Sequence, residues 1–201
     1  MMAIQDIISP GFSDPVFQSQ AAFRALLTAL SEPGTLQSVA ADIIPPEGLA
    51  TATATALLAL ADYETPVWLP ETLRDGPAAT WLRFHCGVAL VDDPARAAFA
   101  VIDGAASEPK LAAFNPGNDQ FPDRSTTVIV QVSGLDGGAG FSLSGPGIPG
   151  TRRVAPQGLR PGFTDELRQN GALYPLGVDV VLASGEGMIG LPRSTQIEEA
   201  R

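Results

Sequence analysis

Two pairs of β-rich segments constrain the fold of this chain more than any other feature of the sequence. The first pair lies on either side of Asp-Gly-Gly at residues 136–138, within the stretch STTVIVQVSGLDGGAGFSLSG. The second pair, GVDVVLAS and GMIGLP, lies on either side of Glu186. Glycine supplies the positive φ that tight hairpin turns require, so we predict two β-hairpins. A chain with these strands must build a sheet and cover it.

Helical segments alternate with further strands. Asp14 followed by Pro15 predicts a helix start, and Pro33 with Gly34 predicts that this helix ends near residue 31. Further helices are predicted at 45–62, 78–87 and 164–171, a helix start at Ser107, and strands at 36–39, 65–69 and 97–104. Interspersed helices and strands are typical of an α/β fold. We therefore predict a mixed sheet with helices on both faces.

The composition is consistent with a packed domain. Hydrophobic residues make up 45% of the chain and charged residues 17%, which is enough apolar material for a core. We expect residues 1–201 to form a single domain, with residues 1–12 flexible and the loop 115–125 mobile.

Charge and cysteine content limit the partners and the compartment. The net charge of −10 repels nucleic acid and anionic lipid, so we exclude both as primary partners. A single cysteine excludes an intrachain disulfide and is typical of a reducing compartment. The first residues lack the basic and apolar regions of a signal peptide. We predict a cytoplasmic protein.

Gly145, Gly147 and Gly150 have the spacing G-x-G-x-x-G of a dinucleotide-binding loop. Such a loop needs a helix directly after it, whose N–H groups bind the pyrophosphate. Here the segment GTRRVAPQ follows, which has no apolar helical face and runs into Pro156. We therefore interpret the glycines as residues of tight turns after a strand.

Five basic side chains are the candidate binding residues: Arg83, His85, Arg152, Arg153 and Arg193. Guanidinium groups bind phosphate and carboxylate through paired hydrogen bonds, so convergence of these side chains would make a phosphate or phosphonate site. The alternative, which the residues alone favour, is that Arg152 and Arg153 are surface charges. In the same interpretation, a local hydrogen bond satisfies His85.

The sequence offers little for nucleophilic, metal or cofactor chemistry. Cys86 and His85 are adjacent, so their side chains point in different directions and do not form a nucleophile–base pair. One histidine and one cysteine are too few for a zinc site. The single lysine, Lys110, follows Pro109, which suits neither a Walker A loop nor a pyridoxal phosphate (PLP) Schiff base. We predict no catalytic residue, no metal and no cofactor, and favour a binding or assembly role.

Six stretches, in this order, resemble one family. They are FRALLTALSEPG (23–34), TATALLALADYETPVWL (53–69), LRFHCGVALV (82–91), FSLSGPGI (141–148), YPLGVDVVL (174–182) and GLPRST (190–195). Their ordered combination resembles the PhnH family, whose members are subunits of the bacterial carbon–phosphorus lyase core complex.

The resemblance implies a cytoplasmic homodimer with a fold similar to the large domain of PLP-dependent transferases, without PLP. It implies a core complex with the G, I and J subunits of the same system. That complex forms alpha-D-ribose 1-methylphosphonate 5-triphosphate from MgATP and a phosphonate. The resemblance places nucleosidase chemistry on the second of these subunits and radical chemistry on the third, an iron–sulfur protein. It assigns the PhnH family no catalytic residue.

Two alternatives stay open from the sequence. One is a stand-alone enzyme that binds phosphate or phosphonate through the five basic residues. The other is a residual PLP enzyme that uses Lys110.

Overall fold

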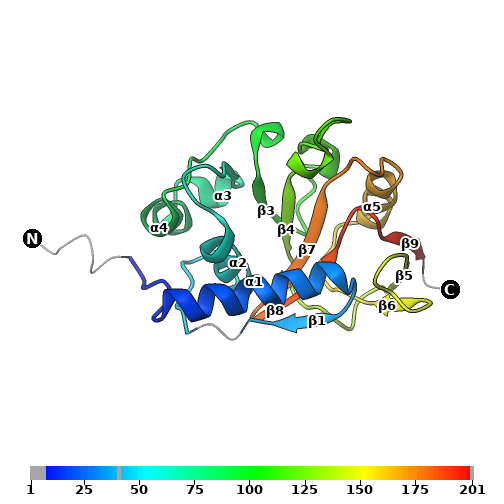
Figure 1. Ribbon diagram of the computed structural model, residues 1–201, viewed down its shortest axis with the longest axis horizontal. Helices are drawn as coiled ribbons and strands as arrows, with labels where there is room; N and C mark the ends of the chain where they lie inside the picture. The colour runs from blue at the N-terminus through cyan, green and yellow to red at the C-terminus, as the bar shows by residue number, and fades with distance from the viewer. Residues whose placement is uncertain (1–7, 40–41, 200–201) are drawn as a thin grey trace, which may run out of the picture.

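The computed structural model describes residues 8–39 and 42–199 and contains two sheets (Figure 1). The larger sheet has the strand order β1-β8-β7-β4-β3-β2, and the smaller has the order β6-β5-β9. In the larger sheet β2, β3, β4 and β7 are parallel, while β8 and β1 are antiparallel to their neighbours. The strands are β1 (Leu36–Ser38), β2 (Val67–Trp68), β3 (Phe99–Asp103), β4 (Thr127–Gln131), β5 (Phe141–Ser144), β6 (Arg152–Val154), β7 (Asp179–Ser184), β8 (Gly187–Leu191) and β9 (Gln196–Glu199).

Helices cover both faces of the larger sheet, as the sequence predicts. One hydrophobic cluster joins the sheet residues Val101, Ile129 and Val181 to helices α1, α2 and α4. A second cluster lies on the opposite face and joins strand residues to α5 and the smaller sheet. The helices are α1 (Pro15–Ser31), α2 (Thr51–Leu60), α3 (Glu71–Arg74), α4 (Pro77–Cys86) and α5 (Phe163–Gly171), with 3-10 turns η2 (Pro94–Arg96), η3 (Leu111–Ala113) and η4 (Pro122–Arg124). The predicted α/β class with a mixed sheet is confirmed.

Local signals place α1 correctly. The Asp14 carboxylate accepts a hydrogen bond from the N–H of Phe17 at 3.3 Å and caps the helix. The buried side of α1 lies directly against β8, because a Cβ atom at Gly190 would stand 2.4 Å from the carbonyl oxygen of Ala29. Small residues on both elements therefore permit the close approach of helix and strand. Most of the segment 1–12, which we expected to be flexible, lies outside the described residues.

The other expected helices and one hairpin are also present. Helix α2 is shorter than predicted. Helix α4 ends at Cys86 and is capped by Gly87, whose φ of +68° is the left-handed conformation typical of a helix end. Strands β7 and β8 form the predicted hairpin around Gly185. In the described part of the chain, no helix is long and apolar enough to cross a membrane.

The first predicted hairpin is wrong. Strand β4 lies inside the larger sheet between β3 and β7, so both of its edges are occupied. Strand β5 instead pairs with β6 and β9 in the smaller sheet. The segment around Gly137 carries the chain from one sheet to the other. The turn glycines in the sequence did not indicate that β3 and β7 pair with the two edges of β4.

The predicted helix start at Ser107 is also wrong. The chain forms only the short η3, and its N-cap residue is Lys110. Side chains from elsewhere bind this backbone: Glu166 accepts from the Leu111 N–H, while Arg160 donates to the carbonyl oxygens of Ala106 and Pro109. Tertiary hydrogen bonds thus replace those of a helix.

The chain leaves β2 and β3 toward opposite faces of the sheet. After β2 it forms the short α3 and then α4, which packs in the first cluster, and Leu90 returns beside Val67 as a parallel bridge. After β3 it enters η3, whose Leu111 packs in the second cluster. In open α/β sheets such a divergence creates a crevice at the carboxyl ends of the two strands.

Candidate functional site

Arg193, which follows β8, is held by an ion pair. Its Nη2 lies 2.8 Å from Asp179 Oδ2, and its Nε donates to Asp179 Oδ1 at 3.2 Å. Its Nη1 donates to the carbonyl oxygen of Pro122 at 2.6 Å. The guanidinium therefore joins the start of β7 to the 3-10 turn η4.

Arg152 and Arg153 are neighbours on β6 and have different surroundings. Arg152 is half-buried and donates from Nη1 to the carbonyl oxygens of Glu32, at 3.4 Å, and of Pro33. Both carbonyl groups follow the end of α1, where cations are favoured by the helix dipole. Arg153 is exposed, and its guanidinium lies against Gly140.

His85 is satisfied by the local backbone. Its Nε2 donates to the carbonyl oxygen of Ser9 at 3.0 Å, and the same oxygen accepts from Trp81 Nε1 at 2.8 Å. The imidazole also stands edge-on to the rings of Trp81 and Phe84. The single histidine thus holds the segment before α1 against α4. Arg83 on the same helix is exposed.

Cys86 points away from His85, as the sequence predicts for adjacent residues. Its Sγ lies 3.8 Å from the carbonyl oxygen of Leu57. Burial, together with the negative charge of Asp62, raises the pKa of the Cys86 thiol to about 11. The thiol therefore stays protonated at neutral pH and is a poor nucleophile.

The five predicted residues do not line a common cavity. Arg193 lines a cavity at the end of α5, while Arg153 lines a different one beside Leu36 and Leu135. Arg83 and His85 lie on α4, and Arg152 is bound to the end of α1. The five side chains come from α4, β6 and the segment that follows β8.

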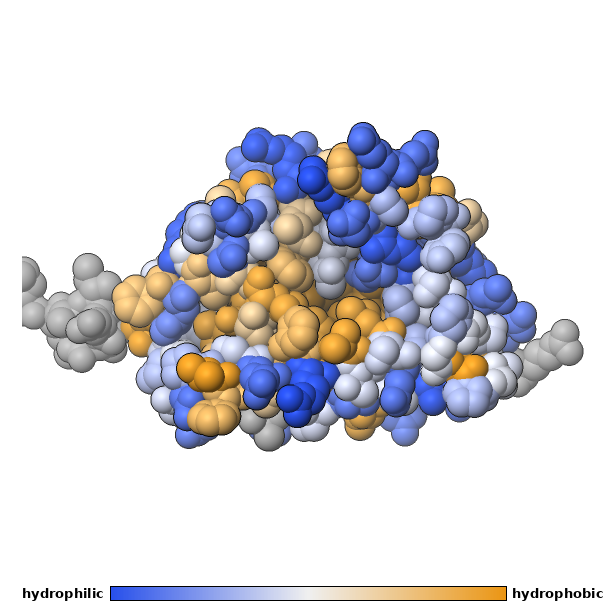
Figure 2. Space-filling model, viewed as in Figure 1, coloured by the Kyte–Doolittle hydropathy of each residue, from blue (hydrophilic) through white to orange (hydrophobic). Residues whose placement is uncertain are grey.

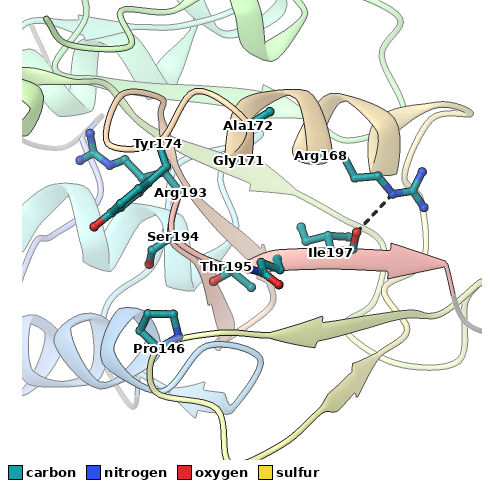
Figure 3. A pocket seen from close by; sticks show the side chains of 10 residues that line it. Pro146, Arg168, Gly171, Ala172, Tyr174, Arg193, Ser194, Thr195 and Ile197 are labelled. Carbon is teal, nitrogen blue, oxygen red and sulfur yellow. Dashed lines mark hydrogen bonds between the residues drawn. The ribbon is translucent and has the colours of Figure 1, made fainter. Parts of the chain in front are cut away.

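The cavity at the end of α5 has a volume of about 520 Å³ (Figure 3). Arg193 and Tyr174 lie on one side of it, Arg168 on the other, and Thr195 between them. Arg168 donates to the carbonyl oxygen of Ile197 at 3.2 Å and pairs with Asp165, so both guanidinium groups are already bound within the fold. The buried hydroxyl of Thr195 has no hydrogen-bond partner among the described residues.

A buried ion pair that the sequence analysis missed lies beside a second cavity. Arg160, whose side chain is 4% exposed, donates from Nε to Glu166 Oε1 at 2.9 Å and from Nη2 to Oε2 at 2.7 Å. The ammonium of Lys110 lies 3.4 Å from Glu166 Oε1. Burial alone would raise the pKa of Glu166, but hydrogen bonds from Arg160 and the Leu111 N–H, with the charges of Arg160 and Lys110, lower it below 4.5.

The second cavity, of about 560 Å³, is lined mainly by apolar side chains that include Leu111, Phe114 and Val178. Lys110 and Glu166 lie at its wall. Glu166 lies in the first turn of α5, where a negative charge is favoured by the helix dipole. No pattern in the sequence indicates that Glu166 pairs with Arg160, because the pairing depends on how the turn between these two residues folds.

A third cavity, of about 540 Å³, lies in the crevice at the carboxyl ends of the parallel strands. Asp103 ends β3 and Gln131 ends β4, and both line the cavity. The Gln131 side chain binds the start of α2, because it donates to the Gly48 carbonyl and accepts from the Ala50 N–H. Asp103 accepts from the Ala105 N–H at 2.9 Å.

The described part of the chain contains no cluster of three His, Cys, Asp or Glu side chains that could hold a metal ion. The polar groups around the three cavities are largely bound within the fold. Within the described ranges, the Cys86 thiol and the His85 imidazole bind the carbonyl groups of Leu57 and Ser9, so they do not form a nucleophile–base pair.

Known proteins are similar to this chain over almost its whole length. The family described as "Bacterial phosphonate metabolism protein (PhnH)" matches residues 10–198. The chain is 37% identical over 198 residues to "Alpha-D-ribose 1-methylphosphonate 5-triphosphate synthase subunit PhnH" of Rhizobium meliloti (strain 1021), which covers 98% of this chain and 99% of that protein. It is 31% identical over 183 residues to "Putative C-P lyase subunit protein HtxG" of Stutzerimonas stutzeri, covering 90% and 86%.

Proposed function

This chain belongs to the PhnH family of bacterial phosphonate metabolism proteins, and we propose that it is an accessory subunit of a carbon–phosphorus lyase core complex. In this role it supports the formation of alpha-D-ribose 1-methylphosphonate 5-triphosphate from MgATP and a phosphonate. The observation that carries the proposal is the 37% identity over nearly the full length of a protein named as a subunit of that synthase.

The environment of the basic residues supports an accessory role. Arg152 and Arg193 bind backbone carbonyl groups and a carboxylate, and His85 binds the Ser9 carbonyl. The hydrogen bonds of these side chains therefore stabilise the fold. The stand-alone alternative requires them to converge on a phosphate or phosphonate instead.

We also propose the finer features that the family resemblance implies. The chain forms a homodimer, acts in the cytoplasm as one domain, and joins the G, I and J subunits. Its fold follows the large domain of PLP-dependent transferases without the cofactor. The parallel strands β2, β3, β4 and β7 support the similarity in fold. The Lys110 ammonium, which is paired with Glu166, supports the absence of PLP. A Schiff-base lysine must instead be free to lose its proton. Purified protein that shows visible aldimine absorbance would contradict the cofactor-free proposal.

Co-purification tests the proposed assembly. We expect the full chain, co-expressed with the G, I and J subunits, to elute with them in a fixed ratio. A matched preparation without this chain shows whether the other three associate alone. Elution of this chain entirely apart from the other subunits would contradict the proposal.

Calorimetry on the isolated chain separates the proposal from the stand-alone alternative. We expect no saturable heat with ATP or methylphosphonate at millimolar concentration. Saturable binding that Arg153→Ala and Arg83→Ala weaken would support the alternative instead.

A further inference from the structure

The second cavity, which lies between η3 and one side of α5, has the volume and the walls of a small-molecule pocket. Its volume of about 560 Å³ is within the range of pockets that bind small organic ligands. Leu111, Phe114 and Val178 line it, and all three belong to the second hydrophobic cluster. An apolar group in this cavity would therefore pack against side chains that the core holds in place.

A polar face of α5 forms another side of the same cavity. Asp165, Glu166 and Gln169 line it and are spaced by one and three residues, which places them on one face of the helix. Leu173, which is 50% exposed, lines the cavity beyond the end of this helix. The cavity thus has apolar walls on one side and polar groups on another. Such a lining suits a ligand that is itself apolar at one end and polar at the other.

Lys110 is the charged group of this lining that can still bind a ligand. Both oxygens of Glu166 accept hydrogen bonds from Arg160, and Asp165 is paired with Arg168. The Lys110 ammonium lies 3.4 Å from Glu166 Oε1, and within the described ranges it donates no hydrogen bond. Its side chain is 45% exposed. Because an ammonium has three N–H donors, it can bind an anionic group that enters the cavity.

The charges at this wall favour an anion as the polar end of the ligand. Arg160 and Lys110 carry two positive charges against the one negative charge of Glu166, which leaves an excess of one. The lowered pKa of Glu166 keeps that carboxyl group ionised at neutral pH, so the excess is present there. Ammonium groups bind carboxylates and phosphonates through charge-assisted hydrogen bonds. A single anionic head group at Lys110 would neutralise the excess.

The surroundings of the cavity favour a small molecule over a protein surface as its occupant. On the face that Figure 2 shows, hydrophobic surface gathers over the region of α1 and α2, and the surface over α5 is mainly hydrophilic. Asp165 and Gln169, on the α5 side of the cavity, are exposed polar residues. A protein interface needs a broad apolar centre, whereas a small ligand needs only an apolar hollow with a few polar groups.

We propose that the second cavity binds a small amphipathic anion. The apolar body of the ligand packs against Leu111, Phe114 and Leu173. Its carboxylate or phosphonate head accepts hydrogen bonds from the Lys110 ammonium. The site binds its ligand without a chemical step. The inference goes beyond the proposed accessory role and does not depend on it.

Calorimetry of the full chain with a matched series of ligands tests the two ends of the site. Phenylphosphonate carries both an apolar ring and an anionic head, and we expect it to bind saturably. Methylphosphonate keeps the head without the ring, and benzyl alcohol keeps the ring without the charge. Each is expected to bind at least about tenfold more weakly, because the first loses apolar burial and the second loses a charge-assisted hydrogen bond. Benzoate has a carboxylate head, and its affinity shows which of the two anions the site prefers.

Substitutions at Lys110 locate the head group. Lys110→Gln removes the ammonium and is expected to weaken phenylphosphonate binding by about tenfold. Lys110→Arg keeps the charge and is expected to bind within a few-fold of the wild type. Arg83→Gln is the matched control, because it removes the same charge from an exposed residue of α4, on the opposite face of the larger sheet. Its expected effect is less than about twofold.

A larger side chain in the lining tests where the ring lies. Gln169→Trp places an indole ring at an exposed position of the lining and is expected to weaken phenylphosphonate binding by at least about tenfold. Gln20→Trp makes the same change at an exposed position of α1, outside the lining of this cavity. This control is expected to bind as the wild type does. Circular dichroism melts show which variants fold.

The single lysine allows a measurement that needs no substitution. Reductive methylation with carbon-13-labelled formaldehyde labels Lys110 and the terminal amine of the chain, and leaves both positive charges in place. The lysine signal is recognised because it titrates near about pH 10, well above the terminal amine. We expect this NMR signal to shift when phenylphosphonate is added, with the affinity that calorimetry measures.

The outcomes separate this inference from the proposed function. Saturable binding of a ring-bearing anion that Lys110→Gln and Gln169→Trp weaken, with both controls unaffected, supports the site. Absence of saturable binding by both phenylphosphonate and benzoate overturns it. Binding that leaves the Lys110 signal unmoved, or benzyl alcohol that binds as tightly as phenylphosphonate, also overturns it. If the variants fail to fold, the ligand series and the Lys110 signal decide. Co-purification with the G, I and J subunits is a separate measurement, so the accessory role stands or falls independently.

Discussion

Arg160 holds Glu166 through two parallel hydrogen bonds, of 2.9 and 2.7 Å, inside the fold. Glu166 is 13% exposed, and the pair connects α5 to the segment between β3 and β4. The Arg160 guanidinium also lies 4.9 Å from the centre of the Phe163 ring. The pair thus fixes the wall of the second cavity.

Glu166→Gln is expected to destabilise the protein by about 3 kcal/mol, because it leaves the buried charge of Arg160 without its counter-ion. Urea denaturation followed by fluorescence measures the change. Asp165→Asn is the matched control, since Asp165 is an exposed partner of Arg168, and its expected effect is less than about 1 kcal/mol. Equal effects of the two substitutions would contradict the structural role given to the Arg160–Glu166 pair.

The contribution of Glu166 to stability is expected to fall in acid. Its pKa in the folded protein is lower than the ordinary 4.5, so the folded state favours the ionised form. The stabilisation is therefore complete above pH 4.5 and is lost as the pH falls from there through the lower folded pKa. The difference in unfolding free energy between the wild type and Glu166→Gln, measured from pH 7 down to pH 3, should shrink below about pH 4.5. A difference that stays constant over this range would contradict the assignment.

Gly147→Ala is expected to cost about 2–4 kcal/mol, because Gly147 has a φ of +78° and an added Cβ atom would lie 2.0 Å from the Ser31 carbonyl oxygen. Gly150→Ala is the control: Gly150 has a φ of +75° with no atom within 4 Å of an added Cβ, so it is expected to cost only about 1 kcal/mol of backbone strain. Thermal melting compares the two variants. If the two variants have the same melting temperature, the turn that contains Gly147 does not pack against the Ser31 carbonyl at the end of α1.

Arg193→Ala is expected to destabilise the protein by about 2–3 kcal/mol, because it leaves the largely buried carboxylate of Asp179 unpaired. Arg153→Ala, at an exposed site, is expected to change stability by less than about 0.5 kcal/mol. Urea denaturation measures both. If the Arg193→Ala protein is as stable as the wild type, the ion pair with Asp179 does not stabilise the fold, and the Arg193 guanidinium is available to bind another group.

Local sequence signals predicted much of the fold. Asp14 and Pro15 identified the start of α1, and Gly87 marked the end of α4, since capping depends on a few neighbouring residues. The glycines after β5 were interpreted correctly as turn residues, because a nucleotide loop requires a following helix and β6 follows instead. Signals of this kind depend only on residues that are close together in the sequence.

The errors concern contacts between distant residues. The turn glycines near Gly137 predicted a hairpin, but the edges of β4 are taken by β3 and β7. Ser107 was expected to start a helix, but Glu166 and Arg160 bind the backbone of that segment. The sequence could identify candidate binding residues. It could not show that Arg152 binds the end of α1 or that Arg193 binds Asp179.

The most direct test of the account is a reconstituted synthesis assay that follows alpha-D-ribose 1-methylphosphonate 5-triphosphate by phosphorus NMR. The G, I and J subunits, with an accessory ATPase-like subunit that the family resemblance also implies, receive MgATP and methylphosphonate. This chain is present or omitted, and it is also assayed alone. We predict that the product forms with the chain present, is greatly reduced without it, and is absent with the chain alone. Product formation that does not depend on this chain, or turnover by the isolated chain, would contradict the account.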